Sequence, residues 1–224
     1  LFSKNILFLC QLIFNKGFLS RFFFPPKENS LMSFFTSQTY KVLKNGKVVF
    51  SVRDMGGNTK SRGVSFFEKE KRTINWIDQF ERDSILIDVG ANIGIYSLYA
   101  ATLKHKVISI EPESLNFALL NLNIFDNKLN KLIKSYPLSI SKTESLGFLN
   151  INNMNWGKSS HTYSTNQLEN NFTQGSIAIS IDELCRKLNL DPNYIKIDVD
   201  GNEIEVIKGM KNEIKKKSLS SILI

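Results

Sequence analysis

The feature that most constrains the fold is the passage from a strand to a helix within residues 85–101, ILIDVGANIGIYSLYAA. A short apolar run ends at Gly90, Gly94 follows four residues later, and a helical pattern begins directly after it. Glycine tolerates the positive φ that a sharp turn out of a strand requires. A strand, a glycine-containing turn and a helix in this order are typical of the first unit of a nucleotide-binding α/β sheet.

Strand and helix patterns continue to alternate after this unit. Further core strands are predicted in KVISIEP, LIKSYPLSI, NYIKIDVDG and LSSILI, with an extra strand in LGFLNIN and a short one in IAISI. Helices are predicted over 95–103, over 114–124 with Ser114 as N-cap, from about 180, and over 202–208. This alternation predicts an α/β fold with a doubly wound, mostly parallel sheet and helices on both faces.

The residues ahead of the sheet divide into an apolar extension and a hairpin. Residues 1–39, which contain ILFLCQLIF, are predicted as an N-terminal helical extension, and residues 40–224 as the domain. The apolar run is about half of the ~20 residues that a membrane span needs, so it packs on the domain, contacts a membrane surface through residues 1–24, or is a trimmed targeting segment. YKVLKNGKVVFSV predicts a hairpin around Asn45-Gly46, DMGGNTKSRG a loop, and the segment from about Glu68 to Phe80 an amphipathic helix.

The net charge and the cysteine content limit the binding partners, metals and cellular compartment that we expect for this chain. Lys and Arg outnumber Asp and Glu by 29 to 21, a net charge of +8. The lysines at 211 and 215–217 are not interleaved with aromatic residues, as a base-stacking surface would require, so we expect no nucleic-acid partner. Cys10, Cys185 and the two histidines fit no metal-ligand spacing. We therefore expect no structural metal and a reducing, cytoplasmic compartment, with association at a membrane as the alternative.

The turn at 90–94 favours an anion but not a dinucleotide. N–H groups at a helix start carry partial positive charge. The run Gly90-Ala91-Asn92-Ile93-Gly94 lacks the G-x-G-x-x-G fingerprint, which disfavours an NAD-dependent oxidoreductase. Asp88 also puts a carboxylate where the phosphates would pass. A ligand that carries an ammonium and a carboxylate suits this turn better, and the methionine end of S-adenosylmethionine carries both.

Two further acidic positions belong to the same edge of the predicted sheet. Glu111 follows Asp88 by 23 residues, close to the offset of ~20 at which an acidic residue meets ribose hydroxyls. Asp198 ends a predicted buried strand, where open α/β sheets bind ligands, and Asp200 follows it. We predict that Asp198 or Asp200 is catalytic, as the base for an acceptor hydroxyl or as its anchor. Mg²⁺ held by acidic side chains is the alternative means of activating a hydroxyl.

Three blocks of the sequence resemble the FkbM family of S-adenosylmethionine-dependent methyltransferases. They are IDVGANIGIYSLYAA, ISIEPESLNFALLNLNIFDN and IKIDVDGNEIEVIKG, in the order and at the intervals of that family. The resemblance implies a class I methyltransferase (Rossmann-like) fold and methyl transfer to oxygen on a sugar or a glycosylated natural product. The family fold continues past the fifth strand with a helix and antiparallel strands, so the chain resembles a fragment that lacks these C-terminal strands.

The resemblance and the spacing together define the predicted site. The predicted cofactor-binding residues are Asp88, Gly90, Ala91, Asn92, Gly94, Glu111, Pro112 and Ser139, and the predicted catalytic residues are Asp198 and Asp200. The resemblance places an acceptor-facing segment in NMNWGKSSHTY, with Gly157, Ser159, Ser160 and His161 as the acceptor-binding residues for a small molecule or a glycan. His161 is also a rival candidate for the base. Asp200 stands where many members have Glu, which shortens the reach of that carboxylate. A non-catalytic nucleotide-binding fragment is the alternative function.

Overall fold

The structure is a computed structural model that describes residues 38–167 and 172–224. Contacts divide the chain into two units, Leu1–Ser37 and Gln38–Ile224, and only the second is described below. The predicted N-terminal helical extension and the predicted membrane contact of residues 1–24 therefore lie outside the described residues. The division of the chain at residue 40 stays a prediction.

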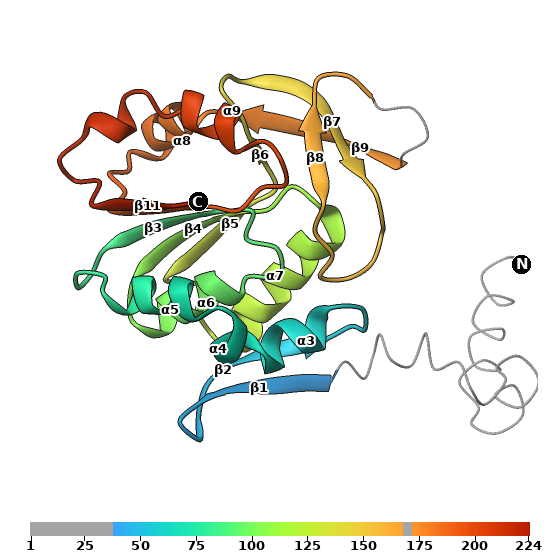
Figure 1. The fold of residues 1–224 in the computed structure, drawn as a ribbon, viewed down its shortest axis with the longest axis vertical. Helices are drawn as coiled ribbons and strands as arrows, with labels where there is room; N and C mark the ends of the chain where they lie inside the picture. The colour runs from blue at the N-terminus through green and yellow to red at the C-terminus, as the bar shows by residue number, and fades with distance from the viewer. Residues whose placement is uncertain (1–37, 168–171) are drawn as a thin grey trace, which may run out of the picture. The chain divides into compact units, whose positions relative to one another are not determined.

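Five parallel strands form the central sheet, in the spatial order β11-β10-β3-β4-β5 (Figure 1). They are β3 (Ile85–Val89), β4 (Lys106–Ile110), β5 (Ile133–Tyr136), β10 (Tyr194–Ile197) and β11 (Ser221–Leu223). Every neighbouring pair runs parallel. The chain moves outward from β3 to β5 and then returns to place β10 on the other side of β3. This reversal between β3 and β10 confirms the predicted doubly wound, Rossmann-like α/β fold.

Helices cover both faces of the central sheet (Figure 1). One face carries α5 (Lys71–Asp78), α6 (Ile95–Thr102) and α7 (Ser114–Asp126), and the other carries α8 (Ile181–Leu188), α9 (Glu203–Lys208) and the short 3₁₀ helix η1 (Glu213–Lys215). Side chains alternate along a strand, so each strand serves both faces. Leu86 and Val107 join the core under α5, α6 and α7, whereas Ile87 and Ile108 join the core under α8 and α9.

A second sheet of four strands, in the order β6-β9-β7-β8, lies at the upper right in Figure 1. Its strands are β6 (Ser139–Ile140), β7 (Ser145–Ile151), β8 (His161–Ser164) and β9 (Phe172–Ile179). The predicted single strand in LIKSYPLSI is wrong, because the chain leaves the central sheet at Tyr136 and enters the second sheet at Ser139. Pro137 has no N–H to donate to a ladder, so it separates the two strands. The predicted extra strand in LGFLNIN is confirmed as β7.

The hairpin ahead of the sheet is formed by β1 (Gln38–Lys44) and β2 (Lys47–Asp54). Asn45 and Gly46 have φ of 52° and 74°, the positive values of the predicted type I′ turn. The hairpin docks on α7 through side chains at the carboxyl end of that helix, Asn123 and the C-cap residue Asn127. Asn127 Oδ1 accepts the Ser51 N–H at 2.8 Å, and Asn123 Oδ1 accepts the Arg53 N–H at 2.9 Å.

The predicted single helix from about Glu68 to Phe80 is wrong. Two short helices, α4 (Phe66–Lys69) and α5, occupy this region. A further helix, α3 (Thr59–Val64), lies in the segment predicted as a loop. Contacts with β2 stabilise α3. The Thr59 hydroxyl donates to Asp54 at 2.8 Å, and Gly63 packs so closely on Val52 that a Cβ there would lie 2.6 Å from a methyl group.

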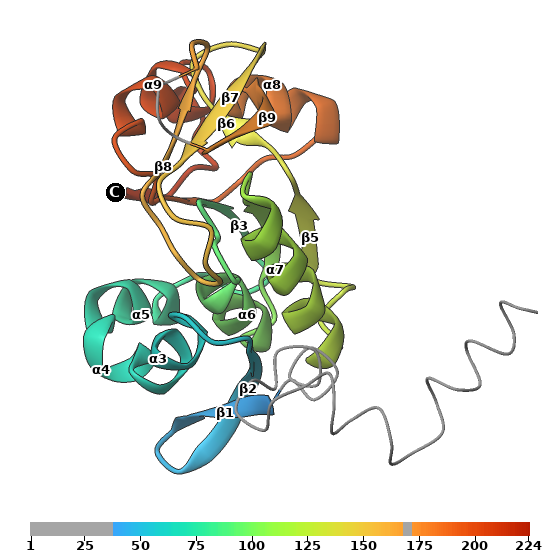
Figure 2. The ribbon, with the colours of Figure 1, turned by 90° about the vertical axis from the view of Figure 1, so that its right-hand side faces the viewer.

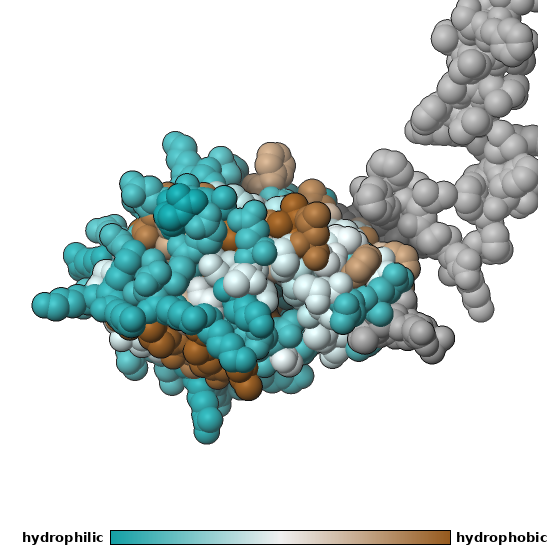
Figure 3. Space-filling model, turned by 90° about the horizontal axis from the view of Figure 1, so that it is seen from above, coloured by the Kyte–Doolittle hydropathy of each residue, from teal (hydrophilic) through white to brown (hydrophobic). Residues whose placement is uncertain are grey.

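The face that carries α8 and α9 is mostly hydrophilic, with hydrophobic residues in separate groups (Figure 3). Within the part of the chain that the structure describes, no helix is both long enough and apolar enough to cross a bilayer.

Candidate functional site

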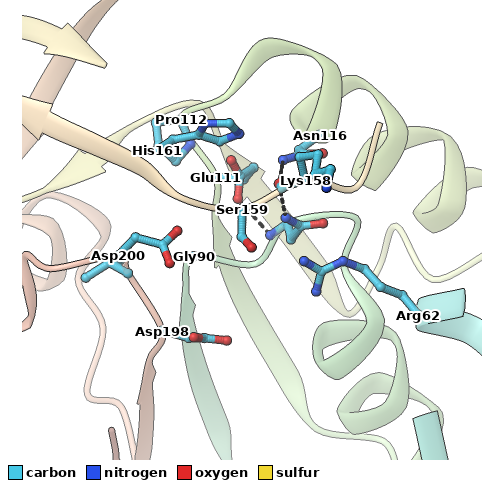
Figure 4. A pocket seen from close by; sticks show the side chains of 12 residues that line it. Arg62, Gly90, Glu111, Pro112, Asn116, Lys158, Ser159, His161, Asp198 and Asp200 are labelled. Atoms are coloured by element: carbon cyan, nitrogen blue, oxygen red, sulfur yellow. Dashed lines mark hydrogen bonds between the residues drawn. The ribbon is translucent and has the colours of Figure 1, made fainter. Parts of the chain in front are cut away.

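A cleft of about 190 Å³ opens at the carboxyl ends of β3, β4 and β10, where the strand order reverses. It is lined by Arg62, Gly90, Asn92, Glu111, Pro112, Asn116, Lys158, Ser159, His161, Asp198, Val199 and Asp200 (Figure 4). Open α/β sheets bind their ligands at this position, because the loops after the two central strands diverge there.

The glycines of the turn after β3 allow close packing. Gly90 has a φ of +77°, and a Cβ on it would lie 2.0 Å from the carbonyl oxygen of Asp198. Gly94, at the N-cap of α6, has a φ of +90°, and a Cβ on it would lie 2.3 Å from a methyl carbon of Leu120. Gly90 thus lets the ends of β3 and β10 approach each other. At Gly94 it is helix α7 that packs closely against the turn.

The backbone N–H groups of this turn are already bonded within the chain. Those of Gly90 and Ala91 both donate to the carbonyl oxygen of Ile110, at 3.0 and 2.9 Å. The N–H of Asn92 donates to the Glu111 carboxylate at 2.7 Å. These three N–H groups are therefore not available to a ligand anion, because the Ile110 carbonyl oxygen and the Glu111 carboxylate already accept from them. Anion binding by the N–H groups at the start of α6, which begins at Ile95, stays a prediction.

Glu111 is buried, with 5% of its surface exposed. Its Oε2 accepts from Asn92 N–H, and its Oε1 accepts from Glu113 N–H at 2.9 Å. Burial raises the pKa of Glu111 to about 7, against the opposite effect of these two hydrogen bonds. Each carboxylate oxygen offers two lone pairs. Glu111 can therefore accept one further hydrogen bond on each oxygen while its orientation stays fixed.

Asp88 lies beneath the cleft rather than on its wall. Its side chain is fully buried and accepts a hydrogen bond of 2.6 Å from the Ser97 hydroxyl, which in turn accepts from Ser109. The second carboxylate oxygen has no hydrogen-bond partner among the described residues, and the Lys196 ammonium lies 3.6 Å from it. The predicted contact between Asp88 and the amino group of a cofactor stays a prediction.

Lys196 is a buried cation that the sequence reading did not select. Only 3% of it is exposed, and its Nζ lies 3.0 Å from Asp198 Oδ2 and 4.5 Å from the centre of the Tyr96 ring. Strand β10 ends at Ile197, so the Asp198 side chain is 68% exposed instead of buried at a strand end. A buried ammonium needs compensating charge. The carboxylates of Asp88 and Asp198, which lie on either side of Lys196, compensate its charge. A lysine within the otherwise apolar run YIKI was the sequence signal by which this buried cation could have been selected.

The connection between β7 and β8 extends from the second sheet down to α6 and α7 (Figures 1 and 2). Residues 156–160 of it, called here the crossing loop, cover one side of the cleft. The carbonyl oxygen of Lys158 accepts from the side-chain amides of Asn92 and Asn116, at 2.8 and 2.9 Å. The Ser160 N–H donates to the Asp200 carboxylate. The crossing loop is therefore tied to the turn after β3, to α7 and to the segment after β10.

Helix α7 presents Asn116 to the crossing loop. The predicted N-cap Ser114 is wrong, because the Glu113 side chain accepts from the N–H groups of Leu115 and Asn116. Glu113 can reach these groups because its own backbone is extended, with a φ of −76° and a ψ of 129°. Asn116, 1% exposed, also accepts from the N–H of Gly157 at 2.9 Å.

Arg62 reaches the cleft from α3. Its Nε–H donates to the carbonyl oxygen of Gly157 at 2.8 Å, and its guanidinium lies across the cleft from Asp200 (Figure 4). The sequence offered no local signal for this arginine, because the segment around it reads as a loop. Arg62 adds positive charge to a cleft that also contains Glu111, Asp198 and Asp200.

His161 begins β8 and lies next to Pro112 (Figure 4). Burial lowers the pKa of His161, so the imidazole is neutral near pH 7. Its Nδ1 is buried and has no hydrogen-bond partner among the described residues. A small hollow beside Pro112 and His161 also includes Ser139, whose hydroxyl bonds to that of Ser176 at 2.9 Å. His161, a predicted acceptor-binding residue, and Pro112, a predicted cofactor-binding residue, therefore lie at the same end of the cleft.

The structure gathers most of the predicted site residues around one cleft. Those that line it are Gly90, Asn92, Glu111, Pro112, Ser159, His161, Asp198 and Asp200, and those that lie beneath or beside it are Asp88, Ala91, Gly94, Ser139, Gly157 and Ser160. Its further lining residues are Arg62, Asn116, Lys158 and Val199. In residues 38–167 and 172–224, no group of three or more His, Cys, Asp and Glu side chains could hold a metal ion, so nothing there supports the Mg²⁺ alternative.

Comparison with known proteins places the chain in a family. Residues 88–222, more than half of the chain, match the model of the methyltransferase FkbM domain. The chain belongs to the FkbM methyltransferase family. The match spans the turn after β3, Glu111 and Asp198, which confirms the resemblance read from the three sequence blocks. Arg62 precedes the matched FkbM region.

One curated protein similar to this FkbM chain is the hexuronic acid methyltransferase AglP of Haloferax volcanii, 32% identical over 142 residues, which are 62% of this chain and 54% of AglP. The chain thus spans about half the length of that relative. Among solved structures, the methyltransferase FkbM from Methylobacillus flagellatus KT aligns with a TM-score of 0.45 and 18% identity, over 63% of this chain and 32% of that chain. Precorrin-6y C5,15-methyltransferase from Geobacter metallireducens GS-15 aligns with a TM-score of 0.38 and 13% identity, over 65% of this chain and 58% of that chain.

Proposed function

We propose that the chain binds S-adenosylmethionine and transfers its methyl group to a hydroxyl of a sugar or a sugar-bearing acceptor. The observation that carries the proposal is Glu111, a buried carboxylate held by two backbone N–H groups on the wall of a switch-point cleft within the matched FkbM region. The similarity to a hexuronic acid methyltransferase supports a sugar as the acceptor.

The cleft residues fit this cofactor chemically. Glu111 keeps one lone pair on each carboxylate oxygen, which suits the two vicinal hydroxyls of a ribose. The Arg62 guanidinium donates only its Nε–H to Gly157 among the hydrogen bonds of the described residues, so its remaining N–H groups can bind a carboxylate. Arg62 would thus hold the methionine carboxylate in place of the turn N–H groups. Pro112 and His161 would flank the adenine ring at the other end of the cleft.

The charge of the cleft favours this cofactor over a dinucleotide. Glu111, Asp198 and Asp200 place three carboxylates around the opening, against the two cations Arg62 and Lys158. Negative charge attracts the ammonium and sulfonium of S-adenosylmethionine and repels a pyrophosphate. We therefore favour S-adenosylmethionine over NAD.

Asp198 is the better candidate for the base. When bound, the cofactor supplies a methyl group that is activated by its positively charged sulfur. The Asp198 carboxylate is exposed at the cleft and oriented by Lys196 at 3.0 Å, so it can accept the proton of an acceptor hydroxyl. Asp200 accepts the Ser160 N–H of the crossing loop. We assign Asp200 to holding this loop.

The direct test is calorimetric titration of this chain with S-adenosylmethionine and, separately, with NAD. We expect S-adenosylmethionine to bind and NAD not to bind. Glu111→Ala should lose this binding, because the two ribose hydroxyls lose their acceptor. Glu81→Ala, an exposed carboxylate ahead of β3, is the matched control and should bind like the wild type.

Each outcome bears on a different part of the proposal. Failure of the folded wild-type chain to bind S-adenosylmethionine would remove the cofactor assignment. Preferential binding of NAD would favour an oxidoreductase. Undiminished binding by a folded Glu111→Ala variant would leave the cofactor but exclude the ribose role of Glu111.

A further inference from the structure

A second, larger cavity adjoins the cleft. Its volume is about 560 Å³, within the range of roughly 300–1,000 Å³ that is typical of small-molecule sites. Its walls are the junction of α4 and α5, Tyr96 of α6, and the ends of β10 and β11. Asp198 lines both this cavity and the cleft. The proposed base therefore stands where the two spaces meet.

The second cavity is rich in positive charge. Lys69, Lys71 and Arg72 line it from the junction of α4 and α5, and all three are exposed. None of them forms an ion pair with another described residue, so all three charges are free to bind an anion beside Asp198. Glu70 also lines the cavity.

The acidic side chains that line the cavity do not balance these cations. Lys196 is paired with Asp198, and Glu70 can offset one of Lys69, Lys71 and Arg72. Two of the three positive charges at the junction therefore have no acidic side chain of the lining to offset them. Arginine and lysine in such a position suit a carboxylate or a phosphate group.

We propose that this cavity is the acceptor site and that the acceptor carries an anionic group, a carboxylate or a phosphate, bound by Lys71 and Arg72 with support from Lys69. The inference rests on the proposed methyltransferase function and specifies its acceptor. An acceptor anchored there by its anion can present a hydroxyl to Asp198. The acceptor oxygen then bonds to the methyl carbon as the sulfur–carbon bond breaks, the bonding pair stays on sulfur, and Asp198 takes the hydroxyl proton.

The test compares three glycosides that differ at carbon 6, which carries a carboxylate, a neutral hydroxymethyl group or a phosphate. The chain, saturated with S-adenosylhomocysteine, is titrated at low ionic strength with p-nitrophenyl glucuronide, with p-nitrophenyl glucoside, and with the 6-phosphate of that glucoside. We expect at least one of the two anionic sugars to bind about tenfold or more tightly than the neutral glucoside. The tighter of the two identifies carboxylate or phosphate as the anchored group.

Two double variants separate the cavity from general charge effects. Lys71→Ala with Arg72→Ala should abolish the preference for the anionic sugar and leave S-adenosylhomocysteine binding unchanged. Lys106→Ala with Lys131→Ala removes the same charge from exposed positions at the amino ends of β4 and β5, and should keep the preference.

The outcomes are distinct from those of the cofactor test. If S-adenosylhomocysteine binds but the anionic and neutral sugars bind equally, or none binds, the anionic acceptor site is excluded while the cofactor assignment stands. A preference that survives in the Lys71/Arg72 variant, or disappears in the Lys106/Lys131 control, would also overturn the inference. If S-adenosylhomocysteine itself does not bind, it is the proposed function that fails.

Discussion

At the scale of single residues, Glu111 combines a structural and a binding role. Its carboxylate links β4 to the turn after β3 through the Asn92 N–H, and it faces the cleft. Two backbone N–H groups favour its charged form, but burial outweighs them and raises its pKa to about 7. The chain thus keeps a carboxylate that is costly to ionise at the point where ribose hydroxyls would stabilise its charge.

The raised pKa predicts a pH dependence of stability that Glu111→Gln removes. An acid whose pKa rises from 4.5 in the unfolded chain to about 7 in the fold contributes stability below pH 4.5 and loses it as the pH rises through 7. Relative to the variant, the free energy of unfolding of the wild type should fall by about 3 kcal/mol over this range. Urea denaturation of both proteins at several pH values measures this difference. A constant difference across the range would contradict the prediction.

At the scale of elements, the crossing loop controls access to the cleft. Side chains of α3, α7 and the turn after β3 hold it closed over a space of about 190 Å³. Ligand pockets for small molecules are usually larger, roughly 300–1,000 Å³. We therefore expect residues 156–160 to move outward when the cofactor enters and to close over it afterwards.

Asn116→Ala tests this view of the crossing loop. The change removes the hydrogen bonds to Gly157 N–H and Lys158 carbonyl oxygen, so the loop should open more often. We expect faster amide hydrogen exchange in residues 156–160 and about tenfold faster dissociation of S-adenosylmethionine in stopped-flow measurements. Asn121→Ala, on the exposed side of the same helix, is the control and should change neither rate. Unchanged exchange in a folded Asn116→Ala protein would show that Asn116 does not hold the loop.

At the scale of the whole folded unit, the sheet depends on the close approach of β3 and β10. The strand order reverses between these strands, and the Asp198 N–H donates to the carbonyl oxygen of Val89 where they end. Gly90 makes this approach possible, because any side chain there would collide with the backbone of Asp198. One glycine therefore determines both the packing at the centre of the sheet and the shape of the cleft.

Gly90→Ala should destabilise the fold and abolish cofactor binding. The positive φ alone costs roughly 1–2 kcal/mol for a residue with a Cβ, and the contact of 2.0 Å with a backbone oxygen forces the strand ends apart. Gly175→Ala in β9 is a matched control, because nothing lies within 4 Å of its added Cβ. Chemical denaturation and calorimetric titration of both variants measure the two effects. Equal stability and binding in the two proteins would refute this role of Gly90.

Sequence alone determined the parts of this protein that depend on local pattern. The alternation of apolar strands and helices predicted the doubly wound sheet, and Asn45-Gly46 predicted the hairpin turn. The spacing from Asp88 to Glu111 and the position of Asp198 after a strand predicted one shared edge, because parallel strands bring their carboxyl ends together. Glu111 and Asp198 do line the same cleft.

Only the tertiary structure decided the features that depend on contacts between separate elements of the fold. Helix α3 is stabilised by packing on β2, so its local sequence reads as a loop and Arg62 could not be selected. Asn116 binds the crossing loop, which lies about forty residues further along the chain. Lys196 can be buried as a cation because the carboxylates of Asp88 and Asp198 lie beside it. A pattern in the sequence reports which face of an element is buried. It does not report which group from another element will pack beside that face, and these packing partners are the residues that form the walls of the cleft.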